Sequence, residues 1–222
     1  MNDNTTPLSA QKYDAEINKT IPYYSEFYDQ TMDVVEQCGF SGIRWLDLGC
    51  GTGMLEEKAL ARFPDVRFVL VDPSEKMLEQ AKEKLKAYDM EYVPGKSTDI
   101  AFEDGFEVVT AIQSHHYMHE EERELAVANV FRALKKGGIF VCFENVVSGD
   151  PAVKQRELLR WGRYQQRRGK TAEEALAHNA RYGVNYFPLT VPQHVELLKK
   201  TGFVSVHVFW ISYMQMGIYA IK

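Results

Sequence analysis

The chain has few cysteines, no long apolar run and no excess of basic residues. Its three cysteines among 222 residues, Cys38, Cys50 and Cys142, show no paired spacing, so neither a disulfide framework nor a zinc site is expected. No apolar run approaches the roughly 18 residues that span a bilayer, and residues 1–11 lack the apolar core of a signal peptide. These absences predict a protein of the reducing cytoplasm that makes no membrane contact.

The formal net charge of −5 gives no overall reason to expect a nucleic acid or an anionic membrane as partner. Hydrophobic residues make up 45% and charged residues 26% of the chain, which is typical of globular proteins. The length suffices for one α/β domain with a full core and is short for two. The composition is therefore that of a globular α/β protein.

Short apolar runs alternate with amphipathic segments along most of the chain. Strands are expected at 43–48, 67–71, 91–94, 106–112 and 139–147. Helices are expected at 22–39, 54–62, 74–85 and 120–134, the last ending in the sequence LKKGG with Gly137 at its C-terminal cap. This alternation predicts a parallel sheet with helices on both faces.

The alternation is interrupted between residues 148 and 190. Two helical segments are expected there, at 151–166 and 171–181, and a further helix at 191–201. The last two runs, 203–212 and 213–222, have the composition of strands and could form a hairpin. We expect a helical cap inserted before a closing helix and hairpin.

Glycines are concentrated in LDLGCGTG, residues 46–53, directly after the first strand. Gly49, Gly51 and Gly53 let the backbone turn tightly and let a ligand approach closely, but their spacing is neither that of a P-loop nor that of a dinucleotide fingerprint. Asp72 ends the second strand, 72 − 53 = 19 residues after Gly53, where an acid can accept both hydroxyls of a ribose. Together they predict an adenosine-type ligand without a 2′-phosphate.

LDLGCGTG, VLVDPSEKML, VPGKSTDIAFEDGFEVV and LKKGGIFV resemble the corresponding segments of class I S-adenosylmethionine-dependent methyltransferases. The resemblance covers roughly residues 43–147. It implies a Rossmann-like fold with a seven-stranded, mostly parallel sheet and an antiparallel final hairpin, with S-adenosylmethionine as cofactor. One departure is Lys96, where many members of the family carry an acid.

The same resemblance implies where the cofactor lies. Asp47 and the loop would hold its methionine part, Asp72 its ribose, and Gln113 with Ser114 would line its sulfonium end. Pro73 or Met77 would pack on the adenine, with Asp99 and the Ile100 amide at the adenine edge. The complete set expected to bind the cofactor is Asp47, Gly49, Cys50, Gly51, Asp72, Pro73, Met77, Thr98, Asp99, Ile100, Gln113 and Ser114.

This interpretation gives one methyltransferase domain in four parts. Residues 1–40 would form an N-terminal helical lid, 41–147 the cofactor-binding core, 148–190 the helical cap, and 191–222 the closing helix and β-hairpin. Tyr13 and Tyr24 of the first part are candidates for substrate contacts over the cofactor, and aromatic packing of an N-terminal helix is the alternative.

Segments outside the core also resemble carboxy-S-adenosylmethionine synthases. YDAEINKTIPYYSEFYD, ARYGVNYFPLTVPQHVELLKKTGF and WISYMQMGIYAIK have the character of that group. The resemblance places Arg181 where the synthases have an arginine that binds the extra carboxylate of their cofactor, a task suited to a guanidinium group. The loop GCGTG, however, keeps the ordinary methyltransferase form.

Three histidines follow the fourth strand in QSHHYMHEE. His115 or His116 would act as a general base on a substrate hydroxyl, amine or thiol, and packing against the backbone is the alternative. A metal site is not expected, because the histidines lack the HExxH pattern.

A stripe of four arginines, Arg156, Arg160, Arg163 and Arg167, recurs at helical spacing in the cap. A stripe of this kind can contact RNA phosphates or form a solvated outer face. The function favoured by the sequence is direct in-line methyl transfer to a small-molecule acceptor. A carboxy-S-adenosylmethionine synthase-like activity, RNA methylation, a non-catalytic cofactor-binding regulator and a homodimer stay open as alternatives.

Overall fold

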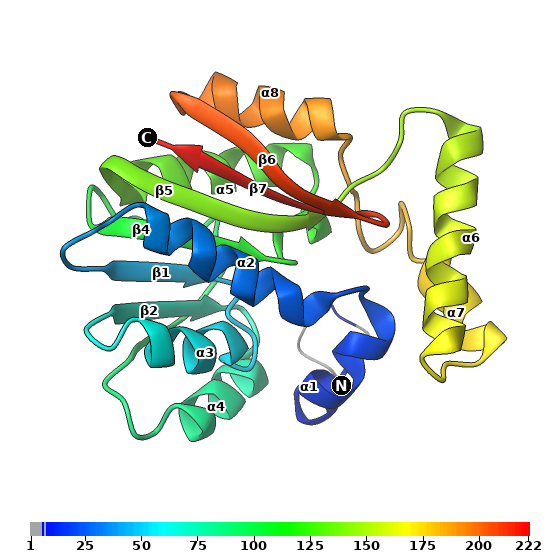
Figure 1. Cartoon of the computed structure of the whole chain (residues 1–222), viewed down its shortest axis with the longest axis horizontal. Coiled ribbons are helices and arrows are strands. Elements are labelled where there is room, and N and C mark those ends of the chain that lie inside the picture. The colour runs from blue at the N-terminus through cyan, green and yellow to red at the C-terminus, as the bar shows by residue number, and fades with distance from the viewer. Residues whose placement is uncertain (1–5, 7) are drawn as a thin grey trace.

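The computed structural model describes residue 6 and residues 8–222, and its centre is one mixed sheet (Figure 1). The strand order in the described chain is β3-β2-β1-β4-β5-β7-β6, and β7 runs antiparallel to both of its neighbours. The strands are β1 (Arg44–Leu48), β2 (Arg67–Asp72), β3 (Glu91–Pro94), β4 (Phe106–Ile112), β5 (Leu134–Asn145), β6 (Ser205–Ser212) and β7 (Gln215–Ile221). The predicted parallel sheet with its closing hairpin is confirmed.

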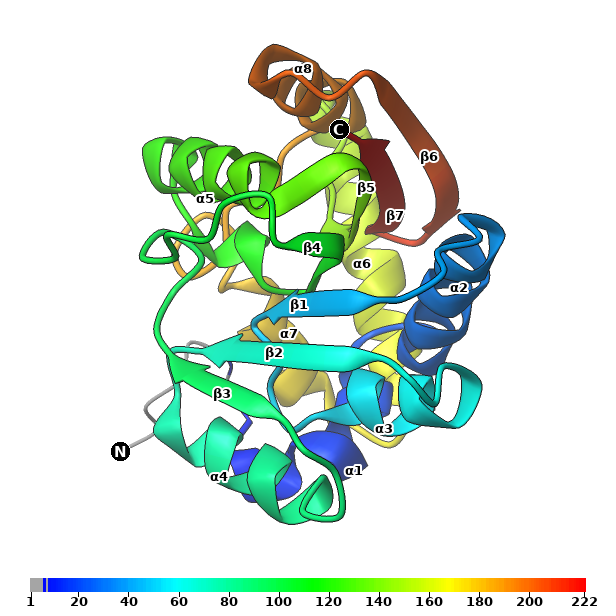
Figure 2. The same cartoon turned by 90° about the vertical axis from the view of Figure 1, so that its left-hand side faces the viewer.

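Helices cover both faces of this sheet. Figure 2 shows α2 and α3 on one side and α5 and α8 on the other, and α4 shares the apolar core of the first side. The helices are α1 (Ala10–Thr20), α2 (Tyr24–Gln37), α3 (Met54–Arg62), α4 (Glu75–Lys84), η1 (His115–Tyr117), α5 (Glu120–Ala133), α6 (Pro151–Arg167), α7 (Ala172–Asn179) and α8 (Val191–Thr201). None of these has both the length and the apolar character that crossing a bilayer requires.

Two segments differ from the sequence-based expectation. Residues 10–20, expected as part of a polar tail, form α1; most of residues 1–7 lie outside the described chain. α5 ends at Ala133 with Leu134 as its C-cap, close to the predicted end, but Gly137 is not at the cap: Leu134 already pairs with Phe106 of β4, and Gly137 donates its amide to the Lys222 carbonyl at 2.8 Å. Contacts with residues distant in the sequence therefore decide the conformation after Leu134.

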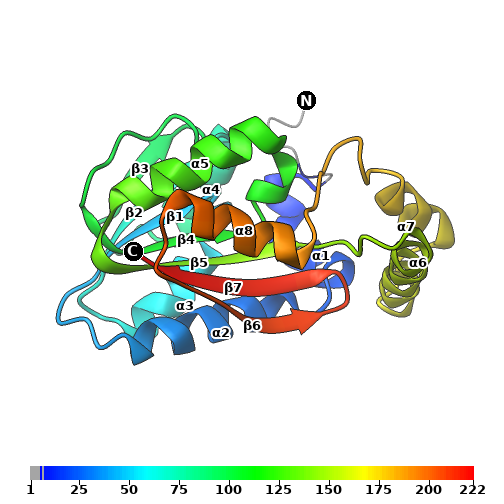
Figure 3. The same cartoon turned by 90° about the horizontal axis from the view of Figure 1, so that it is seen from above.

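The cap helices α6 and α7 stand beside the sheet rather than over one of its faces (Figures 1 and 3). Asp150 caps α6 by accepting from the amides of Ala152 and Val153, and Pro151 occupies its first turn. The buried Trp161 indole donates to the Thr20 carbonyl at 2.7 Å. This bond ties the cap to the end of α1.

Candidate active site

The main cavity opens where β1, β2 and β4 end, at the carboxyl edge of the parallel strands. Its volume is about 190 Å³. In doubly wound folds this edge, beside the point where the strand order reverses, is where ligands bind. The order β3-β2-β1-β4 places that point between β1 and β4, so the cavity lies where the fold predicts a ligand.

The glycine loop forms one wall of the cavity. Gly49 has φ +80°, and a Cβ built on it would lie 2.6 Å from the Cβ of Ser114, so only glycine fits between the loop and the end of β4. Gly51 has φ +57° and lines the cavity, with no atom within 4 Å of where its Cβ would be. The loop is thus held close to β4 and leaves room for a ligand over Gly51.

Two aspartates lie beside this loop, both buried. Asp72 accepts the Gly51 amide at 2.9 Å and the Ser74 amide at 2.8 Å, which fixes the orientation of its carboxylate at the end of β2. Asp47 accepts the Thr110 hydroxyl at 2.5 Å. Burial raises the pKa of Asp47 to about 6, and the Thr110 hydroxyl opposes this rise. The wall by the loop is therefore acidic.

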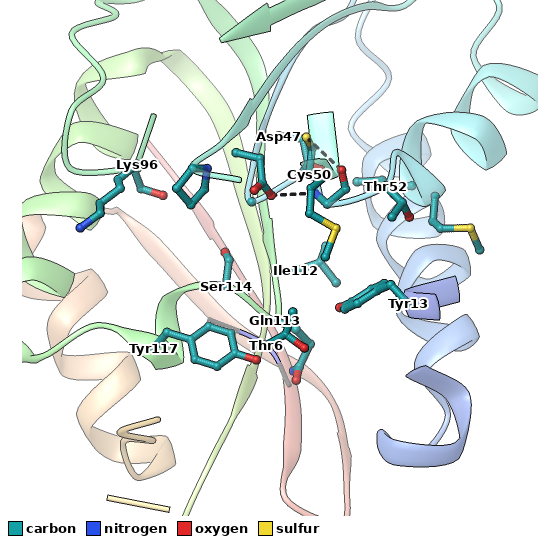
Figure 4. Close-up of a pocket in the computed structure, with 18 of the residues that line it drawn as sticks. Thr6, Tyr13, Asp47, Cys50, Thr52, Lys96, Ile112, Gln113, Ser114 and Tyr117 are labelled. Atoms are coloured by element: carbon teal, nitrogen blue, oxygen red, sulfur yellow. Dashed lines mark hydrogen bonds between the residues drawn. The ribbon is translucent and has the colours of Figure 1, made fainter. Parts of the chain in front are cut away.

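Tyrosines form much of the remaining wall. Tyr13 of α1 and Tyr117 of η1 point into the cavity from opposite sides (Figure 4). The Tyr13 hydroxyl lies 3.3 Å from that of Tyr24, and the rings of Tyr24 and Tyr28 meet edge to face at 5.4 Å. Burial raises the pKa of all four hydroxyls, so they are neutral near pH 7. They offer hydrogen bonds and aromatic faces, but no negative charge.

Comparison with known proteins agrees with this geometry. Residues 46–138 match the model of a family described as a methyltransferase domain. The chain is 25% identical to the carboxy-S-adenosyl-L-methionine synthase of Shewanella loihica over 93% of its own length and 87% of that protein, and 26% identical to that of Nitratiruptor sp. over 87% and 82%. A SAM-dependent methyltransferase structure from Thermotoga maritima superposes with a TM-score of 0.64 at 17% identity, covering 96% of this chain and 95% of that one.

Residues 46–138 thus match a methyltransferase-domain family, and the chain has the fold of class I S-adenosylmethionine-dependent methyltransferases. The predicted fold class, the prediction of an enzyme and the predicted cofactor are thereby confirmed. The residues present fit the cofactor: the cavity joins a glycine loop without a Cβ at Gly51 to an acid at the end of β2, oriented by two backbone amides.

Most residues that the sequence assigns to cofactor binding line the methyltransferase cavity. Asp99 and Ile100 do not: the Asp99 carboxylate accepts the Lys96 amide at 3.1 Å within its own loop, and Ile100 is buried in the core under α5. Contacts from these two to the adenine stay a prediction. The predicted residues on the cavity wall are Asp47, Gly49, Cys50, Gly51, Asp72, Pro73, Met77, Thr98, Gln113 and Ser114, with Tyr13 and Tyr24 from the predicted substrate set.

The two predicted catalytic histidines lie elsewhere. His115 is buried, with Nε2 3.0 Å from the Ser97 hydroxyl, and burial lowers its pKa to about 4. His116 is buried, with Nδ1 3.2 Å from an oxygen of Glu144. Neither lines the main cavity, so the geometry gives no support to either as the general base. Both side chains are packed in the interior, against the Ser97 hydroxyl and the Glu144 carboxylate rather than against the backbone. A role of either as a general base stays a prediction.

Arg181 does not line the cavity, whereas Tyr117 does. The Arg181 guanidinium is near enough to Tyr117 and Tyr186 to oppose the rise in their hydroxyl pKa values that burial causes. A contact of Arg181 with a ligand stays a prediction.

Sequence reasoning missed several residues on the cavity wall. Thr52 and Met54 adjoin predicted site residues, so proximity to the glycine loop was the available signal. Tyr117, Met118 and Glu122 lie between the start of η1 and the first turn of α5, where no motif marks them. Among the described residues no cluster of three or more His, Cys, Asp or Glu side chains could hold a metal ion.

Proposed function

We propose that this methyltransferase transfers the methyl group of S-adenosylmethionine directly to a small-molecule acceptor held inside the cavity. The observation that carries the proposal is that one cavity joins the glycine loop and Asp72 to a wall of buried tyrosines. When bound, the cofactor supplies a methyl group already activated on a sulfonium sulfur. The protein's task is then to align the acceptor and to exclude water.

Each wall of the cavity has a proposed role. Asp72 would accept the ribose hydroxyls, since its carboxylate is held in place by the Gly51 and Ser74 amides. Asp47 would attract the positively charged methionine part. Pro73 and Met77 would pack on the adenine.

The tyrosine wall would position the acceptor. Tyr13, Tyr24 and Tyr117 are neutral, so they would not act as general bases near pH 7, but their hydroxyls can orient an acceptor. Their aromatic faces also favour a cationic sulfonium nearby. An acceptor that enters with its nucleophilic atom already unprotonated fits such a wall.

Removing the Asp72 carboxylate tests the cofactor site. We expect Asp72→Ala to weaken S-adenosylmethionine binding, measured by titration calorimetry, by at least about tenfold, the equivalent of one charge-assisted hydrogen bond. Asp65→Ala is the matched control, because Asp65 is exposed and does not line the cavity. Equal affinity of the wild type and Asp72→Ala would contradict the assignment.

A second candidate function is the synthesis or use of a carboxylated cofactor. It is favoured by the position of Arg181 beside Tyr117 and by the identity to carboxy-S-adenosyl-L-methionine synthases over most of the chain. Arg181→Lys, which keeps the charge but loses the two-pronged hydrogen bonding, is expected to lower activity of this kind by about tenfold or more. Full activity of Arg181→Lys and Arg181→Ala would exclude it.

RNA methylation is a weaker candidate. The side chains of the arginine stripe on α6 are exposed, which fits either a nucleic-acid surface or a solvated one. Arg160 is already engaged, lying 3.9 Å from the centre of the Tyr213 ring and 2.9 Å from the Glu157 carboxylate. The RNA proposal predicts retention on RNA that falls steeply with salt concentration.

We also propose a cytoplasmic location, which the three unpaired cysteines support.

A further inference from the structure

Glu56 is a carboxyl group buried without a hydrogen-bond donor. It lies in the first turn of α3, directly after the glycine loop, and its side chain is 0% exposed. Neither of its carboxyl oxygens has a partner with hydrogen-bond geometry among the described residues. A buried polar group without a partner costs free energy, more so if it is charged, so its protonation state needs an explanation.

Among the charged groups that act on Glu56, Asp47 has the largest effect, and it is itself buried, with 2% of its surface exposed. Two ionised carboxylates would repel each other strongly in such an interior, whereas a protonated acid can donate to its ionised neighbour. Asp47 already accepts the Thr110 hydroxyl at 2.5 Å, which favours its ionised form. The proton therefore belongs on Glu56.

The other groups around the pair do not remove the need for this proton. Lys84 is the nearby cation, but its Nζ lies 2.7 Å from the Asp14 carboxylate and 3.5 Å from the Thr52 hydroxyl. The titratable groups that interact with Glu56 or Asp47 are Tyr24 and Tyr28 of α2, Cys50 of the glycine loop, Asp72 of β2, Lys84 of α4 and Tyr92 of β3.

We propose that Glu56 holds a proton that it donates to Asp47, so that the two carboxyl groups together present a single negative charge to the cofactor. Glu56 is then a positioning residue: it orients Asp47 and keeps it ionised without touching the ligand. The inference about affinity rests on cofactor binding at Asp47, which belongs to the proposed function. The inference that Glu56 is protonated does not depend on the proposed function.

The proposal fixes the direction of a pH effect. Burial raises the pKa of Asp47 to about 6, and a hydrogen bond donated by Glu56 would oppose this rise. Burial raises the pKa of Glu56 further above its usual value, and the charge on Asp47 adds to this. As pH falls through about 6, Asp47 takes up a proton and the pair loses its charge, so affinity for a cationic ligand falls.

Two variants separate the hydrogen bond from simple space filling. In Glu56→Leu the donor is absent, so the midpoint of the pH dependence of S-adenosylmethionine binding should rise by about one unit, a tenfold loss of affinity below that pH. Glu56→Gln supplies an uncharged hydrogen-bond donor and should restore most of the affinity for S-adenosylmethionine that Glu56→Leu loses. An unmoved midpoint in Glu56→Leu overturns the proposal, as does a Glu56→Gln variant that binds as weakly as Glu56→Leu.

Infrared spectroscopy tests the proton directly and does not depend on the ligand. The wild type at pH 7 should show the carbonyl-stretch band of a protonated, buried carboxylic acid, and Glu56→Gln should lack it. Identical spectra in this region would show Glu56 to be ionised and overturn the proposal. If the band is present but the wild type does not bind S-adenosylmethionine, the proposed function fails while the assignment of the proton stands. Glu56→Gln is nearly isosteric, so this test holds even if Glu56→Leu does not fold.

Discussion

Glu56 and Glu144 are two glutamates buried equally deeply, on opposite sides of the sheet, and their surroundings treat them in opposite ways. Their exposed fractions are 0% and 1%. The interior raises the pKa of Glu56, because burial and the neighbouring Asp47 both disfavour its charge. It lowers the pKa of Glu144, because His116 and His115 outweigh the opposing effect of burial. Burial alone therefore does not decide the charge of an acid; its partners do.

The surroundings of Glu144 supply those partners from several elements. Glu144 accepts the His115 amide at 3.1 Å, and one of its oxygens lies 3.2 Å from Nδ1 of His116. Arg123 lies nearby and donates to the carbonyls of Met118 at 2.9 Å and Phe187 at 2.6 Å. This cluster joins the end of β4, α5 and the segment after α7 around one negative charge. Its role is to hold the fold together beside the active site.

Acidification should give the largest difference in stability between the region around Glu144 and the region around Glu56. The pKa values of His115 and His194, near Glu144, fall to about 4 because both are buried, so the folded state binds fewer protons than the unfolded state between pH 6.5 and 4. Stability present above pH 6.5 is then lost as pH falls through this window, on the order of 3 kcal/mol for each histidine.

Hydrogen exchange between pH 7 and pH 4 measures this loss region by region. Amides of α5 and α8 should lose protection at a higher pH than those of α3. The pKa values of the acids beside α3 are raised, so these acids bind more protons in the folded state than in the unfolded state and acidification does not destabilise that region. Loss of protection in α3 first would contradict the comparison.

Glu144→Gln should give the next largest effect. The substitution removes the negative charge that faces His116 and Arg123 and leaves a cation buried without its counter-charge, which typically costs about 3–5 kcal/mol. Chemical denaturation at pH 7 measures the change in unfolding free energy. A loss below about 1 kcal/mol would show that the cluster is not an ionic one. Glu157→Gln on α6, whose ion pair with Arg160 is exposed, is the control and should leave stability unchanged.

The same substitution at position 56 should act in the opposite direction. Glu56 gives up its proton when the chain unfolds at neutral pH, which favours the unfolded state, and glutamine removes this effect. Glu56→Gln should therefore stabilise the protein at pH 7, and by less as pH falls toward the usual pKa of a glutamate. Denaturation curves at pH 7 and near that pKa measure this difference. Destabilisation at pH 7 would mean that Glu56 is ionised in the folded protein.

The sequence predicted the elements whose signals are local. The helix at 54–62 and the strands at 91–94 and 106–112 have the predicted bounds, because glycine, proline and apolar periodicity mark their ends. The role of Gly137 as a helix cap was predicted wrongly, because the conformation of this residue depends on Lys222, far away in the chain. Local pattern cannot reveal a strand partner that distant.

The residues of the candidate site likewise fall into those that a local motif identifies and those whose position only the assembled fold decides. Asp47, Gly51 and Asp72 belong to motifs that identify them, and the structure places all three on the cavity wall. His115 belongs to an equally conspicuous motif, but its side chain turns away from the cavity, and only the packing of β5 and α8 decides this. Glu56 looks like one more acid at a helix N-terminus. Its burial is a property of the assembled fold.

The central claim is that the cavity beside the glycine loop binds S-adenosylmethionine through Asp72. The most direct test is a calorimetric titration of the purified wild type and of Asp72→Ala with S-adenosylmethionine at pH 7.5. We predict saturable one-to-one binding by the wild type and affinity lower by at least about tenfold in Asp72→Ala, with the variant's unfolding temperature close to that of the wild type. No saturable binding by the wild type, or equal affinity of the two proteins, would contradict the claim.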